Sequence, residues 1–332
     1  MIGLMCPDIF DYELQCQRRM NFPAIEVPRQ ISAQTLVEEL GNSRPRQWSK
    51  MKIRQMRKLE HLDGEPRLTA IDSDAIETVL TRNRAKGSSL VKAIILGAGQ
   101  GKRLLPLTTD VPKALLDVGG KTLIRRQIDA LSAAGINEFV VVTGYGAEKM
   151  EHALELIARD RLIEIRCIYN PFFQVADNLA SCWMVRDEME GEFIQINGDN
   201  IFRGELVEGL LKSAMGTVTV AINRKSRYDA DDMKVMLDGE RLTEIGKTLP
   251  VETVDAEAVG LYVFRGEGTE KYRTVLEQAM REPQGLRQWF PAAVGVLAKN
   301  IDISVCDVGH HQWCEVDFPA DLQQARHMVA GW

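Results

Sequence analysis

The chain has 332 residues, of which 45% are hydrophobic and 27% are charged, a globular composition with enough apolar side chains for one large domain and an appendage. Its net charge of −6 is unevenly distributed, because residues 1–90 hold 14 basic and 12 acidic side chains whereas the rest of the chain holds 27 and 35. An acidic C-terminal region argues against nucleic acid as its substrate, since phosphate backbones need a broad basic face.

The sequence does not have the features expected of membrane or secreted proteins. No apolar run reaches the length of a membrane span. The N-terminus carries no basic segment, and Pro7 and Asp8 interrupt its apolar stretch, so a secretory signal is not expected. The six cysteines form no CxxC pair, and we therefore expect reduced thiols and a cytoplasmic location.

Residues 1–89 are expected to form a small helical extension whose role the sequence does not reveal. Short helices are expected at 32–40 and 73–82, with a basic amphipathic helix beginning at Arg44 between them. This basic helix could contact nucleic acid, a partner or its own domain. Residues 84–89 have the composition of a linker.

Residues 90–332 alternate between strand and helix patterns. A short continuous apolar run predicts a buried strand at 91–96. Further strands are expected at 138–143, 163–168, 193–196, 217–222, 258–264 and 301–307, and helices from residue 123 to Gly135, at 177–189, near 267–281 and at 319–330. A hairpin is expected around Asp238-Gly239. This order predicts a doubly wound, mostly parallel, Rossmann-like α/β sheet with antiparallel hairpin additions.

A glycine-rich loop follows the first of these strands, and three interpretations of it compete. The glycines stand at 97, 99 and 101, which is not the G-x-G-x-x-G spacing of a dinucleotide-binding loop. Gly101-Lys102 is followed by Arg103, so the hydroxyl that a Walker loop offers to Mg²⁺ is missing. A strand followed by GAGxGxRL, PLT and PKAL fits without adjustment.

Segments 97–104, 106–108 and 112–116 resemble the signature of the nucleotidyltransferases that make NDP-sugars and CDP-alcohols. The resemblance extends from about residue 91 to 326 and is strongest to the bacterial phosphocholine and phosphonate cytidylyltransferases. It implies a Mg²⁺-dependent enzyme that condenses CTP with a small phospho- or phosphono-compound, phosphocholine or 2-aminoethylphosphonate for example. The products would be a CDP-activated compound and pyrophosphate.

The resemblance also assigns catalytic and metal-binding residues. Like-charge repulsion between the two phosphates is the main obstacle to this reaction, so catalysis should consist of positioning and charge neutralisation. Arg103 and Lys113 would contact the triphosphate as catalytic cations. Asp199 and Asp317 would supply the hard oxygen ligands that suit Mg²⁺.

The expected binding residues fall into two groups. The nucleotide would contact Leu96, Gly97, Ala98, Gly99, Gly101, Lys102, Tyr145, Asn178 and Ser181. Lys247 would hold the phosphate of the acceptor, and Asp231 and Asp232 would bind an ammonium group, with a solvated acidic loop as the alternative for the two aspartates. The candidates for an aromatic wall around a cationic head group are Trp183, Trp289 and Trp313.

Two other functions stay open at this point. The chain could be a sugar-1-phosphate nucleotidyltransferase that uses UTP, dTTP or GTP, although Asn178 and Ser181 favour CTP. It could also be a regulator that senses a nucleotide and binds DNA through its N-terminal helices. The sequence leaves the oligomeric state undetermined, and a dimer is possible.

Overall fold

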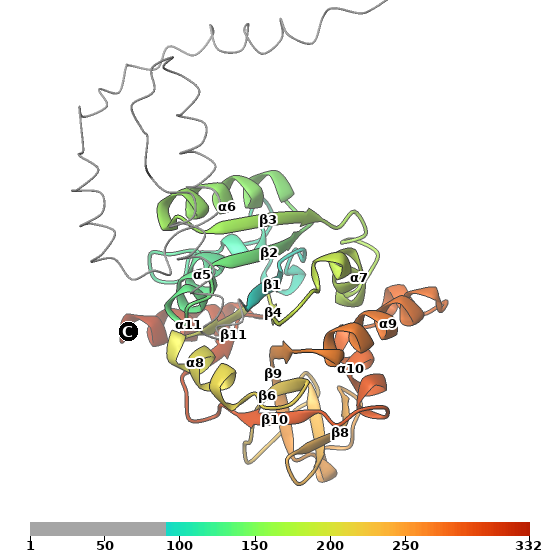
Figure 1. Ribbon diagram of the computed structural model, residues 1–332. Helices are drawn as coiled ribbons and strands as arrows, with labels where there is room; N and C mark the ends of the chain where they lie inside the picture. Colours follow the sequence, from blue (N-terminus) through green and yellow to red (C-terminus); the bar gives the residue numbers. More distant parts are fainter. Residues whose placement is uncertain (1–90) are drawn as a thin grey trace, which may run out of the picture. The chain divides into compact units, whose positions relative to one another are not determined.

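The computed structural model describes residues 91–332, so the helices, the basic segment and the linker expected in the extension lie outside the described residues. The described residues form an α/β domain on a nine-stranded sheet with a separate two-stranded sheet (Figure 1). None of the helices within this range is both long and apolar enough to cross a membrane.

One half of the large sheet is parallel, in the strand order β3-β2-β1-β4. Its strands are β1 (Lys92–Leu96), β2 (Glu138–Thr143), β3 (Glu164–Tyr169) and β4 (Phe193–Asn197). Helix α5 (Leu123–Ala133) connects β1 to β2, and α6 (Ala147–Arg161) connects β2 to β3. Thr122 caps α5, because its hydroxyl accepts the Arg125 N–H.

The other half of the large sheet is largely antiparallel. Its strands are β6 (Val218–Asn223), β7 (Lys234–Asp238), β8 (Arg241–Gly246), β9 (Ala256–Phe264) and β10 (Ser304–Asp307). Strand β9 lies antiparallel between β4 and β6, and β7 and β8 form the expected hairpin. Five of the nine pairings in this sheet are antiparallel. The predicted α/β class is therefore confirmed, but the prediction of a mostly parallel sheet is wrong. Strand β9 is buried on both faces, and a continuous apolar run does not indicate the direction in which a strand runs.

Helices cover both faces of the sheet (Figure 1). Helices α7 (Asn178–Met184), α9 (Glu267–Arg281) and α10 (Phe290–Ala298) bury one core, and α5, α6 and α8 (Gly204–Ser213) bury the other. Helix α11 (Pro319–Ala330) packs beside the small sheet of β5 (Asn200–Phe202) and β11 (Trp313–Glu315). Short 3₁₀ turns lie at Lys102–Leu104, Lys113–Leu115, Arg186–Glu188, Val251–Thr253 and Gly285–Arg287.

Two pairings place the functional loops together. Leu96 at the end of β1 pairs with Asn197 at the end of β4, so the glycine loop lies beside Gly198-Asp199. A Cβ on Gly198 would lie 2.4 Å from the Leu96 carbonyl oxygen, so only glycine permits this close approach. The Val316 N–H then donates to the Asp199 carbonyl at 3.1 Å, which carries the chain after β11 to the same place.

Candidate active site

The Lys113 ammonium lies between two carboxylates that are distant in sequence. Its Nζ is 2.9 Å from Asp199 Oδ2 and 2.6 Å from Asp317 Oδ1, and its side chain is 11% exposed. Gly101 packs against the stem of this lysine with φ of +72°, and a Cβ there would lie 2.9 Å from Lys113 Cβ. The last glycine of the loop is therefore required both for its backbone conformation and for the space that Lys113 occupies.

The charges in this cluster stabilise one another. Burial alone would lower the pKa of Lys113, but the two aspartates outweigh it and raise the pKa. Burial would likewise raise the pKa of Asp317, and Lys113 reverses that shift and lowers it. Glu315 is different, because burial and the charges of Asp199 and Asp317 raise its pKa to about 8. The centre thus consists of one ammonium held between two aspartate side chains.

The two aspartates fit a divalent cation. Asp199 Oδ1 is buried and has no hydrogen-bond partner within residues 91–332, so this oxygen is available as a metal ligand. Within residues 91–332, no group of three or more His, Cys, Asp or Glu side chains is arranged to hold a metal ion. A pair of carboxylates suits Mg²⁺, which takes its remaining ligands from water and substrate phosphates.

A cavity of about 220 Å³ opens beside this centre, where the nucleotide is expected. The expected residues that line it are Leu96, Gly97, Ala98, Gly99, Gly101, Asn178 and Ser181, together with Lys113 and Asp199. Asn178 also accepts the Phe290 N–H at 2.9 Å, which fixes the start of α10 against α7. The structure therefore brings together seven of the nine expected nucleotide-binding residues.

Several cavity residues were not expected from the sequence. They are Ala114, Asn170, Phe173, Ala176, Asp177, Asn197 and Gly198. Asn170 donates from Nδ2 to Ser181 Oγ at 3.0 Å and so orients that hydroxyl. A sequence signal for Asn170 and Asn197 exists, because both stand at or just after the carboxyl end of a parallel strand, the edge where α/β sheets bind ligands.

Tyr145, one of the expected nucleotide ligands, does not line the cavity. Its hydroxyl donates to the Thr109 carbonyl, and its ring meets the Phe173 ring edge-on at a centroid distance of 6.2 Å. Its own N–H donates to the Ala98 carbonyl at 2.9 Å. Tyr145 thus holds the loop that follows the glycines, and Phe173 presents an aromatic surface to the cavity in its place.

Arg103 and Lys102 line a second hollow, of about 300 Å³, next to the first. Arg103 Nη1 lies 3.6 Å from Asp317 Oδ2, and its Nη2 lies 3.3 Å from Asp231 Oδ1. Its guanidinium also stacks over the Phe318 ring at 5.1 Å. Arg103 therefore connects the centre to the side where the acceptor is expected.

Lys247 and Asp231 meet at this acceptor side, whereas Asp232 does not. Lys247 Nζ lies 4.0 Å from Asp231 Oδ1 and 4.7 Å from the centroid of the Trp289 ring. Asp232 instead accepts from Lys225 Nζ at 2.9 Å, in a separate buried cluster. The idea that the two adjacent aspartates form one ammonium pocket is therefore not supported, because their side chains bind different cations.

The three tryptophans do not form a common wall. Trp183 stacks with the Arg186 guanidinium at 4.1 Å, and Trp313 belongs to β11, where it pairs with Phe202. Trp289 alone lies beside a residue of the acceptor side, and its ring already carries the Lys247 ammonium.

Known proteins resemble this chain in sequence and in fold. The Nucleotidyl transferase family matches residues 92–232. The chain is 35% identical over 242 residues to a choline-phosphate cytidylyltransferase of Streptococcus pneumoniae, covering 72% of this chain and 98% of that protein. It is 30% identical over 236 residues to a bifunctional IPC transferase and DIPP synthase of Aquifex aeolicus, covering 70% of this chain. The chain spans about half the length of that bifunctional relative, 50% of it.

A solved structure of the inositol-1-phosphate CTP transferase from T. maritima has the same fold, with a TM-score of 0.62 and 20% identity. The match covers 73% of this chain and 96% of that one. The family match and the choline-phosphate cytidylyltransferase relative lead to one assignment. The chain belongs to the nucleotidyltransferase family of enzymes, whose members generally use a divalent metal.

Proposed function

We propose that residues 91–332 form a cytidylyltransferase that transfers a cytidylyl group from CTP to a small phospho- or phosphono-compound. An acceptor oxygen would attack the α-phosphorus of CTP, and the bond to the leaving pyrophosphate would break. The observation that carries the proposal is the Lys113 ammonium held between Asp199 and Asp317 at the edge of the glycine-lined cavity.

Charge neutralisation is what these residues can contribute. Both reacting phosphates are anionic, so a preorganised cation at the α-phosphate lowers the barrier without covalent chemistry. Lys113 is buried and its pKa is raised, so it stays protonated throughout the accessible pH range. Arg103 is nearly half exposed at the mouth of the site, where a planar guanidinium can pair with phosphate oxygens.

Mg²⁺ is the metal that we propose for this site. Asp199 and Asp317 would hold it, and the bound ion would supply charge neutralisation at the α-phosphate and the leaving pyrophosphate. Lys113 contacts both carboxylates and so fixes the distance between them. Glu315, whose pKa is raised to about 8 by burial and by the charges of Asp199 and Asp317, adds a further negative charge only when it is ionised.

We assign the cytosine base of CTP and the acceptor to different ends of the site. Asn178 and Ser181 line the cavity, and their amide and hydroxyl groups can read a cytosine edge. On the other side, Lys247 can hold the acceptor phosphate. A phosphorylated polyol, which carries no ammonium group, is a second candidate acceptor. Asp231 is already paired with Arg103 and Lys247, and Lys247 already covers the Trp289 ring, so the carboxylate and the ring that could bind an ammonium group both have a cation beside them.

A pyrophosphate-release assay with the purified full chain tests the proposal. CTP, UTP, dTTP and GTP would each be combined with phosphocholine, 2-aminoethylphosphonate, inositol 1-phosphate and a hexose 1-phosphate. We expect release with CTP and one of the first three acceptors. Release only with UTP, dTTP or GTP and the hexose phosphate would show a sugar nucleotidyltransferase, and no release with any pair would favour the nucleotide-sensing regulator.

The variant Asp199→Asn tests the metal site separately from the nucleotide and acceptor sites. We expect normal folding, loss of most turnover and loss of the stabilisation by Mg²⁺ that calorimetry would detect in the wild type. Asp160→Asn, at a surface pair with Arg125, is the matched control and should change neither. Near-normal turnover of Asp199→Asn in saturating Mg²⁺ would remove this residue from the metal site.

A further inference from the structure

A cluster of two largely buried carboxylates and the partly exposed Lys225, outside the catalytic centre, supports the segment that carries Asp231. Lys225 Nζ lies 2.9 Å from Asp232 Oδ1 and 2.7 Å from Glu257 Oε2. Both carboxylate side chains are at most a tenth exposed, and Asn223 donates to the other oxygen of Glu257 at 2.8 Å. Without a cation between them, two neighbouring buried carboxylates would repel each other. The Lys225 ammonium therefore allows Asp232 and Glu257 to lie side by side.

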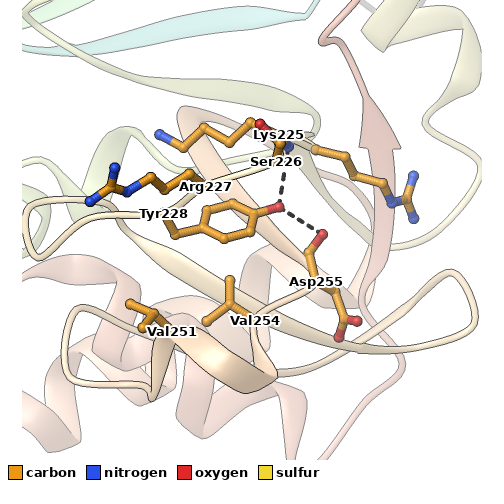
Figure 2. Close-up of a pocket in the computed structure, with 8 residues that line it drawn as sticks. Lys225, Ser226, Arg227, Tyr228, Val251, Val254 and Asp255 are labelled. Carbon is orange, nitrogen blue, oxygen red and sulfur yellow. Dashed lines mark hydrogen bonds between the residues drawn. The ribbon is translucent and has the colours of Figure 1, made fainter.

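The same lysine is fixed from its backbone. Its N–H donates to the Tyr228 hydroxyl at 3.2 Å, and that hydroxyl donates to the Asp255 carbonyl at 3.0 Å (Figure 2). Asp255 is the residue that precedes β9, so the Tyr228 hydroxyl connects the segment after β6 to the strand in the middle of the sheet. A hollow of about 770 Å³ opens beside these groups, and Val254 and Arg227 are among the residues that line it.

The segment from 225 to 232 ends next to the acceptor side. It joins β6 to β7 without being a strand itself, so the sheet ladder does not fix its conformation. Asp229 and Asp232 order its last turn, since Asp229 Oδ1 accepts the N–H groups of Asp231 and Asp232 and Asp232 Oδ2 accepts that of Asp229. Asp231 then extends from this turn toward Arg103 and Lys247.

We propose that Lys225 is a positioning residue for the acceptor side: by holding Asp232 against Glu257, it fixes the turn that places Asp231 between Arg103 and Lys247. The proposal rests on the proposed function, in which Lys247 and Asp231 face the acceptor. Lys225 itself does not touch the reacting groups. It acts through one peptide unit, because the anchored side chain of Asp232 and the functional side chain of Asp231 are neighbours in sequence.

Steady-state kinetics of Lys225→Met and Lys225→Arg test this role. A displacement of about 1 Å can cost roughly 100-fold in rate, so we expect Lys225→Met to lower kcat/KM for the acceptor by about 10- to 100-fold. KM for CTP should change by less than about twofold, because no group of the Lys225 cluster lines the nucleotide cavity. Lys225→Arg, which keeps a cation for both carboxylates, should recover most of the loss. Lys271→Met, at the ion pair with Glu267 on α9, is the control and should change neither parameter.

A double-mutant cycle decides whether Lys225 acts through Asp231. In an Asp231→Asn background, Lys225→Met should have little further effect on the acceptor, because the side chain to be positioned has lost its charge. Fully additive effects, or an equal rise of KM for CTP and for the acceptor, would overturn the proposal.

Hydrogen exchange gives a readout that does not depend on the reaction. Lys225→Met should increase amide exchange in peptides that cover residues 226–233, while peptides from β1 and β4 stay protected. Unchanged exchange in 226–233 would refute the positioning role even if activity fell. If the wild type released no pyrophosphate with any substrate pair, the proposed function would fail. The exchange experiment would still test whether Lys225 fixes the conformation of residues 226–233.

Discussion

Replacing Lys113 by methionine should destabilise the protein in a way that a divalent cation repairs. Asp199 Oδ2 and Asp317 Oδ1 both contact the Lys113 Nζ, so the two oxygens are less than about 6 Å apart. Methionine keeps the apolar stem of the side chain and removes the ammonium, with its charge and its hydrogen-bond donors. Two carboxylates at about 5 Å repel by about 3 kcal/mol at an effective dielectric constant near 20.

Solvent reduces this cost, because the side chains of Asp199 and Asp317 are 26% and 36% exposed. We therefore expect a loss of about 2 kcal/mol in the free energy of unfolding, which lowers Tm by roughly 4–8 °C for a domain of this size. A bound divalent cation would replace the missing ammonium, so Mg²⁺ should raise the Tm of Lys113→Met more than that of the wild type, where Lys113 competes for the same oxygens.

Differential scanning calorimetry in EDTA and in saturating Mg²⁺ measures both effects. Lys121→Met is the matched control, since Lys121 is half exposed and Arg125 and Arg161 still pair with its partner Asp129, so its loss should cost less than about 1 kcal/mol. Turnover of Lys113→Met should fall by about 10²–10³, the scale for removing one preorganised charge. The reasoning would be refuted if the Tm of Lys113→Met in EDTA lay within about 2 °C of the wild-type Tm, an interval that corresponds to about 1 kcal/mol. Equal increases in Tm on addition of Mg²⁺ to the two proteins would also refute it.

Three further predictions address backbone packing, the acceptor and pH. Gly198→Ala should lower both Tm and turnover, because its Cβ would lie 2.4 Å from the Leu96 carbonyl oxygen. Gly331→Ala has room for a Cβ and should be neutral, and equal Tm values for the two variants would contradict the close approach at Gly198. Lys247→Ala should raise the acceptor KM by about 10-fold or more with little change for CTP, as for a lost charged hydrogen bond, and an unchanged acceptor KM would exclude this lysine from the site. Burial would raise the pKa of Asp129, but three neighbouring cations outweigh it and lower the pKa below its usual 3.8. Asp129→Asn should therefore be less stable at pH 7, with a Tm difference that shrinks as the pH falls below about 4, and a constant difference would contradict the ion cluster.

Features that depend on local chemistry could be predicted from the residues alone. Continuous apolar runs located β1, β2 and β6, and the Asp-Gly pair located the β7–β8 hairpin. The glycine loop was identified because GAGxGxRL, PLT and PKAL resemble a family signature, and Gly101, with its positive φ, is a position whose conformation favours glycine. Those constraints lie within a few residues of the chain, so they can be read without knowing what packs against it.

The direction of β9 and the contacts between distant charges depend on how the chain folds. A strand buried on both faces has the same apolar composition whichever way it runs, so β9 could not be oriented from its residues. Lys113 meets Asp199 and Asp317 because β1 pairs with β4 and β5 pairs with β11, across 86 and 204 residues of sequence.

The acceptor side shows the same division between local and distant information. Asp231 and Asp232 are adjacent and identical in chemistry, and the sequence therefore assigned both to one pocket. In the structure Asp232 is held by Lys225 in a buried cluster, and Asp231 reaches Arg103 and Lys247. In an irregular segment the direction of each side chain is set by the partner that compensates its charge, and those partners come from parts of the chain that only folding brings together.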